Sequence, residues 1–332
     1  MAEHRRNPGD DLGSPRMSTP EVSVVIPTYR REARLRFALE GLAEQSLATD
    51  RFEAIVVRTP NSAPPLAEAP EGLNVRFLES SQTGPAAQRN AGWRAAAGSL
   101  VAFMDDDCRP APAWLERAIA DAGPGTVLQG RTEPDPDELH LLFGLARTMR
   151  VDGVSELFPT CNIVYPRRLL EQLDGFDETF TAPWGEDTDL GQRALAAGAS
   201  ARFSSDALVW HAVLPNPLPD ALRTARRRRW LPVVIARHPH LRSDLLGRVF
   251  VNRTHATLAT ALAGALLPAS GLRRAAWLPY FLNLLAGHAR GAAITPRGIA
   301  RLALHLPVRL LVDVVEVGST VEGAIRARTP VI

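Results

Sequence analysis

The sequence predicts an α/β protein in which a largely parallel sheet is flanked by helices and followed by a mainly α-helical C-terminal region. The first observation is that short apolar runs of strand length alternate with stretches of helical spacing between residues 21 and 215. The second is that this alternation stops at the proline-rich residues 215–219, after which arginine-rich stretches follow. We therefore expect a first domain of residues 21–215 and a basic helical region of residues 216–332.

The elements of the first domain follow in order along the chain. Residues 1–20 are polar and contain Pro, Gly and Ser, which predicts a disordered tail. Val22–Ile26 is a β-branched run closed by Pro27, as expected of a buried parallel strand. Further strands are expected at 52–57, 74–79, 99–104, 126–131, 163–165 and 201–211, and helices at 30–45, 85–97, 112–121, 139–149, 167–173 and 188–197.

Charge is distributed unevenly along the 332 residues. Residues 1–215 carry 21 arginines against 31 acidic residues, whereas residues 216–332 carry 17 arginines against 5, so the net charge of +2 hides an acidic and a basic part. A basic region favours phosphate, acidic glycan or anionic lipid partners. No nucleic-acid-binding motif accompanies the charge, so we expect no nucleic-acid partner.

The cysteines and the N-terminus bear on the compartment. Cys108 and Cys161 have neither CxxC nor Cys/His ligand spacing, which predicts free thiols in a reducing environment. No apolar run follows Arg5 and Arg6, so we expect no signal peptide. The predicted location is cytoplasmic.

Three consecutive carboxylates, Asp105, Asp106 and Asp107, follow a buried apolar strand. Ligands of such sheets bind at the carboxyl ends of the strands, so the triplet is expected in the ligand crevice. Alternation along a strand predicts that Asp105 and Asp107 point the same way and Asp106 the opposite way. Converging carboxylates repel each other unless a cation lies between them, which predicts a divalent metal, Mn²⁺ or Mg²⁺, and a diphosphate ligand. A solvated surface turn is the alternative.

A second acidic pair, Glu186 and Asp187, precedes a predicted helix. Such acids can cap the helix, but together with the triplet they indicate a catalytic loop in which Asp187 is the general base and Glu186 its neighbour. His211 ends a strand and is a candidate metal ligand, with a structural role as the alternative. Arg89 lies near a predicted helix start, where guanidinium and helix terminus both favour phosphate; a surface arginine is the alternative.

The order of these motifs resembles glycosyltransferase family 2. The matching segments are Val-Val-Ile-Pro-Thr-Tyr-Arg-Arg, Gln-Arg-Asn-Ala-Gly, Phe-Met-Asp-Asp-Asp-Cys, Gly-Glu-Asp-Thr-Asp-Leu and Trp-His, all within residues 21–213. The resemblance implies the GT-A fold, a Rossmann-like mixed sheet flanked by helices. It also implies an inverting, metal-dependent transfer of a sugar from a nucleotide-diphosphate donor.

The resemblance also assigns roles to single residues. The donor-binding residues that it implies are Pro27, Thr28, Tyr29, Arg89, Asp105 and Asp106. Asp107 is implied as the direct metal ligand, with Asp105 as its partner and His211 as a later ligand. Asp187, beside Glu186, is implied as the base that deprotonates the acceptor hydroxyl, and Trp184 and Gly185 lie on the acceptor side.

One departure from the family pattern concerns the nucleotide base. Members of the family usually carry an acid after the second strand, but here the chain runs Arg58-Thr59-Pro60-Asn61-Ser62 without a carboxylate. Asn61 or Ser62 could replace the acid by hydrogen bonding. A uridine nucleotide is therefore not assumed.

The basic tail lies outside the family pattern. Its apolar stretches at 256–269 and 275–286 are shorter than a membrane-spanning helix, and the stretch at 299–317 contains charged residues. Arginine-rich helices with Trp and Leu faces suit a membrane interface, which predicts peripheral contact with an anionic membrane at the inner face of the cell membrane. A helical subdomain packed on the catalytic domain is the alternative.

Three functions compete on this evidence. The leading one is transfer of a sugar to a hydroxyl of a glycan or polyprenyl-linked acceptor. A nucleotidyltransferase also joins an α/β sheet to an acidic metal site, but it needs no acceptor base, so Glu186 and Asp187 argue against it. A non-catalytic binding or scaffold protein that keeps the GT-A fold is supported only by the departure at Arg58 and Thr59.

Overall fold

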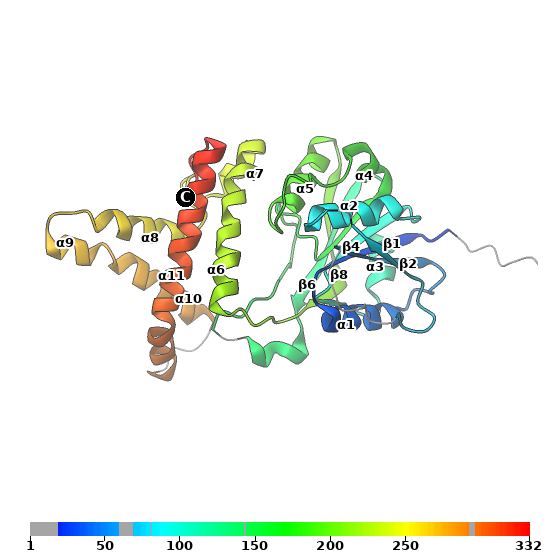
Figure 1. Ribbon diagram of the computed structural model, residues 1–332, viewed down its shortest axis with the longest axis horizontal. Helices are drawn as coiled ribbons and strands as arrows, with labels where there is room; N and C mark the ends of the chain where they lie inside the picture. Colours follow the sequence, from blue (N-terminus) through cyan, green and yellow to red (C-terminus); the bar gives the residue numbers. More distant parts are fainter. Residues whose placement is uncertain (1–18, 60–68, 81, 143, 292–295) are drawn as a thin grey trace, which may run out of the picture.

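Eight strands form one mixed sheet in the order β3-β2-β1-β4-β7-β6-β8-β5 (Figure 1). The computed structural model describes residues 19–332 apart from 60–68, 81, 143 and 292–295, with the backbone alone for 287–291 and 296–303. Asn61, Ser62 and most of the tail predicted at 1–20 thus lie outside the described residues. The strands are β1 (Val22–Thr28), β2 (Phe52–Arg58), β3 (Val75–Glu79), β4 (Leu100–Met104), β5 (Cys108–Pro110), β6 (Thr126–Pro134), β7 (Asn162–Pro166) and β8 (Ser200–His211).

The sheet is parallel at one end and mixed at the other. Strand β1 pairs in parallel with β2 and β4, and β2 pairs in parallel with β3. Strand β7 runs antiparallel to both β4 and β6, and β5 runs antiparallel to β8. Strands β6 and β8 pair in parallel. The largely parallel sheet expected from the alternation of elements therefore holds for β1–β4 and for the pair of β6 with β8, whereas β7 and β5 run antiparallel to their neighbours.

Helices cover both faces of the sheet. Because alternate side chains of a strand point to opposite faces, Val24 and Ile26 pack in one core cluster and Val25 in the other. The first cluster includes Leu35 and Trp114, and the second includes Leu190. The helices are α1 (Glu32–Ala43) and α3 (Trp114–Asp121) on one face, and α2 (Pro85–Ala95), α4 (Arg167–Leu173) and α5 (Glu186–Ala196) on the other (Figure 1).

The helix predicted at 139–149 is wrong. A short 3₁₀ helix, η1 (Pro136–Leu141), stands there instead, and the side chain of Asp135 accepts a hydrogen bond from its first turn. Gly144 then adopts a positive φ of 62°, which stops helical continuation. The next residues turn back toward the sheet, and Arg147 forms an isolated bridge with Leu214.

The chain beyond the sheet is helical and packs against it. The side chain of Phe180 joins an apolar cluster with Val234, Leu241 and Val331, which holds the last residues of the chain. The elements are α6 (Leu218–Arg226), η2 (Arg227–Trp230), α7 (Leu231–Arg237), η3 (Pro239–Asp244), α8 (Arg253–Gly264), α9 (Ser270–Ala275), α10 (Leu278–Gly291) and α11 (Pro296–Ala327). Helices α8, α9 and α10 form an arm that points away from the sheet (Figure 1).

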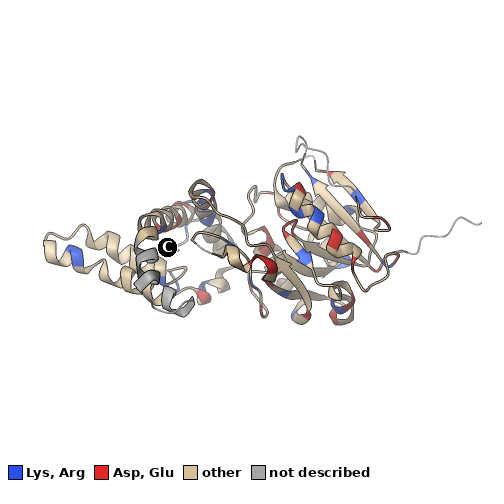
Figure 2. Ribbon diagram, turned by 90° about the horizontal axis from the view of Figure 1, so that it is seen from below, with Lys and Arg blue, Asp and Glu red and all other residues tan. Residues whose placement is uncertain are grey.

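The acidic side chains gather on the sheet domain, and the arm carries none of them (Figure 2). Within the described residues, no helix is both long enough and apolar enough to span a membrane.

Candidate active site

The candidate site lies where β1 and β4 end. The two strands run parallel and adjacent, so their carboxyl ends meet at one edge. The Thr28 hydroxyl donates a 2.8 Å hydrogen bond to Asp106 Oδ2, and the Tyr29 backbone N–H lies 3.4 Å from the same oxygen. Asp106 is thereby fixed to the turn that contains Pro27, and the Tyr29 ring is exposed.

The three aspartates form a turn rather than a continuation of the strand. Strand β4 ends at Met104, and the backbone N–H of Cys108 donates to the carbonyl of Asp105. One nitrogen of Arg31 contacts both Asp106 Oδ1 (2.9 Å) and Asp107 Oδ2 (2.6 Å). The predicted alternation, with Asp106 opposite to its neighbours, is wrong because strand geometry no longer applies in this turn.

His211 and Asp107 come together across the pairing of β5 with β8. In that register Cys108 lies opposite His211, and the distance from His211 Nε2 to Asp107 Oδ1 is 3.6 Å. A carbonyl can only accept, so the 2.8 Å contact of His211 Nδ1 with the Ala212 carbonyl leaves Nε2 with a free lone pair. Asp107 Oδ1 is buried and has no hydrogen-bond partner in the described part of the chain.

These atoms fit a divalent cation. Ligand atoms of Asp107, Cys108 and His211 lie within 4.8 Å of one another, and all three residues are buried. Burial raises the pKa of the Cys108 thiol well above its usual range, so its neutral sulfur is a weaker ligand than the carboxylate and the imidazole. The unpaired Asp107 Oδ1 and the free His211 Nε2 are the atoms that would coordinate a metal.

Arg89 connects the acidic triplet to the second acidic pair. Its guanidinium donates to Asp105 Oδ1 and to Glu186 Oε1, each at 2.9 Å, although 97 residues separate Arg89 from Glu186. The Arg89 side chain lies over the ring of Phe176 and is buried. We predicted that Arg89 contacts the nucleotide-sugar donor. In this structure both of its terminal nitrogens donate hydrogen bonds to carboxylates.

Asp187 lies at the start of α5 and is partly exposed, whereas Glu186 is buried. The helix N-cap is Gly185, which has a positive φ of 95°, so neither acid is the N-cap residue. Glu186 accepts a hydrogen bond from the Trp184 backbone N–H, and Asp187 accepts one from that of Thr188. Burial, and to a smaller extent the negative charge of Glu186, raise the pKa of the Asp187 carboxyl to about 7.

The sequence matches two protein-family models. Residues 23–164 match the model described as glycosyl transferase family 2, and residues 137–290 match the model described as glycosyl transferase family group 2. The two models together cover residues 23–290 and support a glycosyltransferase of family 2. Several curated relatives are named glycosyltransferases or glucosyltransferases.

Two such relatives show how far the similarity extends. Glycosyltransferase AglE of Haloferax volcanii is 27% identical over 210 residues, which cover 59% of this chain and 68% of the relative. Validoxylamine A glucosyltransferase of Streptomyces hygroscopicus subsp. limoneus is 27% identical over 272 residues, which cover 69% of this chain and 59% of the relative. The chain thus matches 68% of the length of the first relative and 59% of the length of the second.

The fold also matches a solved structure. A mannosyltransferase from Pyrobaculum calidifontis, solved in complex with GDP-Man and Mn²⁺, aligns with a TM-score of 0.57 at 20% sequence identity, over 93% of this chain and 87% of that one. The glycosyltransferase has the GT-A fold with additional C-terminal helices.

The site of this glycosyltransferase contains groups that sequence reasoning missed. Arg31 is the last residue of the matching segment Val-Val-Ile-Pro-Thr-Tyr-Arg-Arg, and its position there was the only sequence signal for its contact with the triplet. Asp189 is buried and contacts His238 Nε2 at 3.0 Å, which fastens α5 to the C-terminal helices. At the end of the second strand, Arg58 forms a 2.7 Å ion pair with Glu79 of β3.

Proposed function

We propose that the glycosyltransferase transfers a sugar, with inversion, from a nucleotide-diphosphate donor to a hydroxyl of a glycan or lipid-linked acceptor, with Asp187 as the general base. The observation that carries the proposal is that Asp187 is a partly exposed residue at the start of α5 and that the pKa of its carboxyl is raised to about 7. A base with a pKa near the working pH combines a large ionised fraction with useful basicity.

The position of Asp187 relative to the acidic triplet supports this role. Asp105 is joined through the Arg89 guanidinium to Glu186, the residue before Asp187. Asp105, on the proposed donor side, and the segment that contains Asp187 are therefore held by one network of ion pairs rather than by separate loops. Such fixed positioning is what an in-line displacement at a sugar carbon requires.

The donor side of the proposal rests on the turn at the end of β1. Thr28 and the Tyr29 backbone, which follow Pro27, contact Asp106, and the Arg31 guanidinium brings a positive charge to Asp106 and Asp107. We assign this edge to the nucleotide diphosphate, and we assign Asp107 and His211, supported by Asp105, to a divalent metal. When bound, such a cation neutralises negative charge on the diphosphate leaving group.

The competing functions make different predictions for the same residues. A nucleotidyltransferase has no use for a base beside an acceptor hydroxyl, and the raised pKa of Asp187 would then serve no purpose. A scaffold protein would not need the unpaired Asp107 Oδ1 and the free Nε2 of His211 to face each other. Sugar transfer accounts for both features.

Calorimetry with a panel of uridine and guanosine diphosphate sugars in the presence of Mn²⁺ tests the proposal. We expect at least one donor to bind the wild type and none to bind Asp107→Ala. Asp187→Asn should bind that donor normally and lose transfer by about 10²- to 10⁴-fold, the usual contribution of a general base. Full activity of Asp187→Asn would overturn the assignment of the base, and failure of every donor to bind would favour the scaffold.

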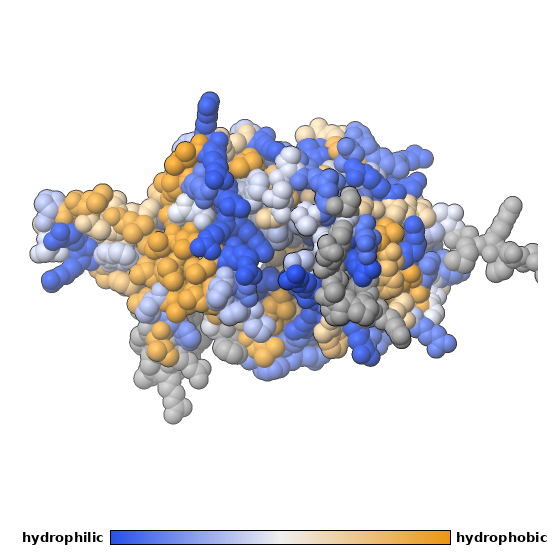
Figure 3. Space-filling model, in the orientation of Figure 1, coloured by the Kyte–Doolittle hydropathy of each residue, from blue (hydrophilic) through white to orange (hydrophobic). Residues whose placement is uncertain are grey.

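We further propose that the helical arm contacts an anionic membrane. No Asp or Glu occurs between Asp244 and Asp313, whereas this segment contains arginines such as Arg273 and Arg274. Figure 3 shows apolar residues gathered over the region of α8, α10 and α11. The exposed large apolar side chains of the arm and its loops are Leu262, Leu266, Leu267, Leu272, Leu278, Phe281 and Leu282. An acid-free apolar surface with basic residues suits the interface of an anionic bilayer.

A further inference from the structure

Glu316 lies where three elements of the C-terminal region meet. It belongs to α11, and its Oε1 accepts a 2.8 Å hydrogen bond from Arg228 Nε of η2. His255 Nε2 of α8 lies 3.3 Å from the same oxygen. Burial alone would raise the pKa of Glu316, but the hydrogen bond with His255 and the charge of Arg228 hold that pKa below its ordinary value. The Glu316 carboxylate is therefore ionised at neutral pH.

Close packing of α11 on η2 fixes the position of this carboxylate. Gly323 lies about two helical turns after Glu316, and thus on the same face of α11. A Cβ added to Gly323 would lie 2.1 Å from the carbonyl oxygen of Arg229, so the backbones of α11 and η2 are in direct contact there. Glu316 is therefore presented to Arg228 by a packed helix rather than by a loop.

The Arg228 guanidinium in turn contacts the loop that leads to the candidate base. Its central carbon lies 5.2 Å from the centre of the Trp184 ring, within the range of a cation–π contact. Glu316 is the one acidic residue that pairs with Arg228 in the part of the chain that the structure describes. Because Glu316 binds Nε of Arg228, the orientation of the guanidinium over the ring depends on Glu316.

Trp184 connects this contact to Asp187. The Trp184 backbone N–H donates to Glu186 Oε2 at 2.8 Å, and Arg89 donates to the other oxygen of the same carboxylate. Only Gly185, which has no side chain, stands between Trp184 and the start of α5 at Glu186. Trp184 is therefore the last side chain that can anchor the loop before the base, and a displacement of Trp184 would be passed on to Asp187.

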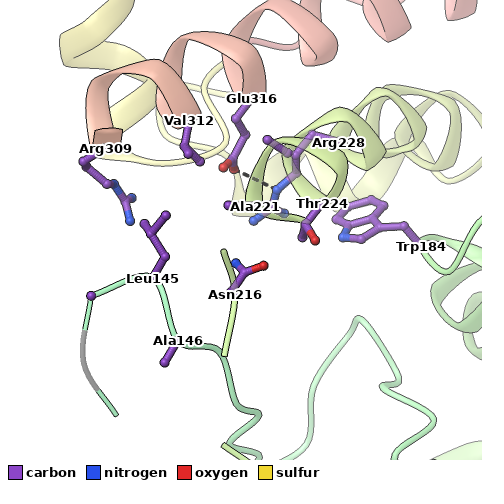
Figure 4. Close-up of a pocket in the computed structure, with 12 residues that line it drawn as sticks. Leu145, Ala146, Trp184, Asn216, Ala221, Thr224, Arg228, Arg309, Val312 and Glu316 are labelled. Carbon is purple, nitrogen blue, oxygen red and sulfur yellow. Dashed lines mark hydrogen bonds and ion pairs between the residues drawn. The ribbon is translucent and has the colours of Figure 1, made fainter. Parts of the chain in front are cut away.

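The Trp184 ring borders an open space. Trp184, Arg228 and Glu316 all line a cavity of about 220 Å³ between the sheet domain and the C-terminal helices. Figure 4 shows these three side chains along one side of the cavity, with a dashed line between Arg228 and Glu316. Because the cavity leaves room beside the ring, apolar packing does not restrain the ring from that side. The contact with Arg228 supplies a restraint that packing does not.

We propose that Glu316 is a positioning residue for sugar transfer. It holds the Arg228 guanidinium on the Trp184 ring and thereby holds the loop that presents Asp187 to the acceptor hydroxyl. The inference rests on the proposed role of Asp187 as the general base. It makes α11 a part of the catalytic unit rather than a helix that only covers the sheet domain.

Steady-state kinetics of the full-length protein, with a donor that binds the wild type, test the inference. Glu316→Gln should lower kcat by about 10- to 100-fold, because a small misplacement of a catalytic group can cost that much. The KM and the calorimetric Kd of the donor should not change, because Thr28 and Arg31 hold Asp106 without the help of α11. The stoichiometry of donor binding gives the folded fraction of each variant, so kcat is calculated per folded molecule.

A double-variant cycle shows whether Glu316 acts through Trp184. Trp184→Leu should lower kcat at least as much as Glu316→Gln does. The double variant should lose no more than Trp184→Leu alone, since both changes break the same chain of contacts. Glu322→Gln is the matched control, because Glu322 lies on the same helix and forms an exposed pair with Arg326. It should leave kcat unchanged.

Three outcomes would overturn the inference. One is that Glu316→Gln has the same kcat as Glu322→Gln. Another is that the losses of Glu316→Gln and Trp184→Leu multiply in the double variant, and the third is that Glu316→Gln raises the donor KM and leaves kcat unchanged. Each leaves the proposed function intact if the wild type transfers the sugar and Asp187→Asn does not. A wild type that transfers from no donor would instead overturn the proposed function, and this inference with it.

Discussion

Arg89 and Glu186 form a 2.9 Å ion pair in which neither side chain is more than 5% exposed. The same guanidinium contacts Asp105, so a single arginine from α2 fixes both acidic segments of the site. The geometry of the donor edge and that of the base loop therefore depend on one another.

Replacing Arg89 by Met should destabilise the protein by about 3–5 kcal/mol, because Glu186 would then be buried without a charged partner. Urea unfolding monitored by circular dichroism measures this change. The double variant Arg89→Met/Glu186→Met should recover part of the loss. Arg36→Met, which breaks the exposed pair with Glu40, should cost no more than about 0.5 kcal/mol. Equal losses for Arg89→Met and Arg36→Met would show that the buried pair has no special role.

The rate of transfer should rise with pH through about 7, because burial and the charge of Glu186 raise the pKa of Asp187 to about 7 and the base acts only when ionised. Glu186→Gln removes the negative charge that contributes to this shift. The acidic limb of the rate profile should therefore move to lower pH. It should stay above the ordinary range of aspartate, since burial, the larger cause, remains.

Initial rates between pH 5 and 9, measured with a saturating donor, give the position of the acidic limb of the rate profile. Glu171→Gln, an exposed glutamate of α4, is the control and should leave the profile unchanged. Complete loss of activity in Glu186→Gln would assign the base to Glu186 instead of Asp187. An unshifted limb would show that another group controls it.

Substitution of His211 by Gln should weaken Mn²⁺ binding by at least roughly 10- to 100-fold, since loss of a group that only orients a metal ligand already costs that much. The reason is that His211 Nε2 is the free nitrogen nearest to the unpaired Asp107 Oδ1. Calorimetric titration of the nucleotide-bound protein with Mn²⁺ measures this change in Mn²⁺ affinity. His240→Gln, which changes a histidine that contacts Gln192 on α5, should bind Mn²⁺ like the wild type. Equal affinity of the two variants would remove His211 from the metal site.

Much of the sheet could be predicted because its strands are apolar and β-branched. Helix α4 was predicted to the residue at Arg167–Leu173, and β6, β7 and β8 within a few residues of their ends. Strand β5 was missed because three residues carry no periodic signal, yet its pairing brings Cys108 opposite His211.

The site was harder to predict than the sheet, because its contacts join residues far apart in sequence. The acidic segments have clear local signatures, so Asp105 and Asp187 could be named from the sequence. The ion pair of Arg89 with Glu186 and the contact of Asp189 with His238 depend on how α2, α5 and α7 dock. No local sequence pattern predicts how these helices dock, and the roles given to these residues remain predictions.

Membrane contact should depend on the exposed apolar side chains of the arm. Leu266 is 88% exposed, and removal of one such side chain from an interface costs about 1.5–3 kcal/mol. Leu266→Glu and Phe281→Glu should therefore each reduce flotation with vesicles that contain phosphatidylglycerol by roughly tenfold or more. Phe37→Glu, which changes an exposed phenylalanine of α1 on the sheet domain, is the control. Equal flotation of all three variants would contradict a docking role for the arm.

Gly185 holds the base loop through both its backbone and its lack of a side chain. Its φ is 95°, and an added Cβ would lie 2.8 Å from Val234 Cγ2 and 3.0 Å from Phe180 Cε1. Both contacts belong to the cluster that docks the C-terminal helices, so the substitution should displace the start of α5. We expect Gly185→Ala to lower kcat by about 10²-fold through misplacement of Asp187.

Gly198→Ala separates the two effects in Gly185→Ala, because Gly198 has a φ of 92° but no atom within 4 Å of an added Cβ. Left-handed backbone strain alone should cost Gly198→Ala about 1–2 kcal/mol of stability, with kcat unchanged. Gly185→Ala should lose more stability than that, because steric contact adds to the same strain. Urea unfolding and steady-state kinetics of the two variants test this difference. If both lost equal stability and kept full kcat, the packing of Phe180 and Val234 against Gly185 would not position the base.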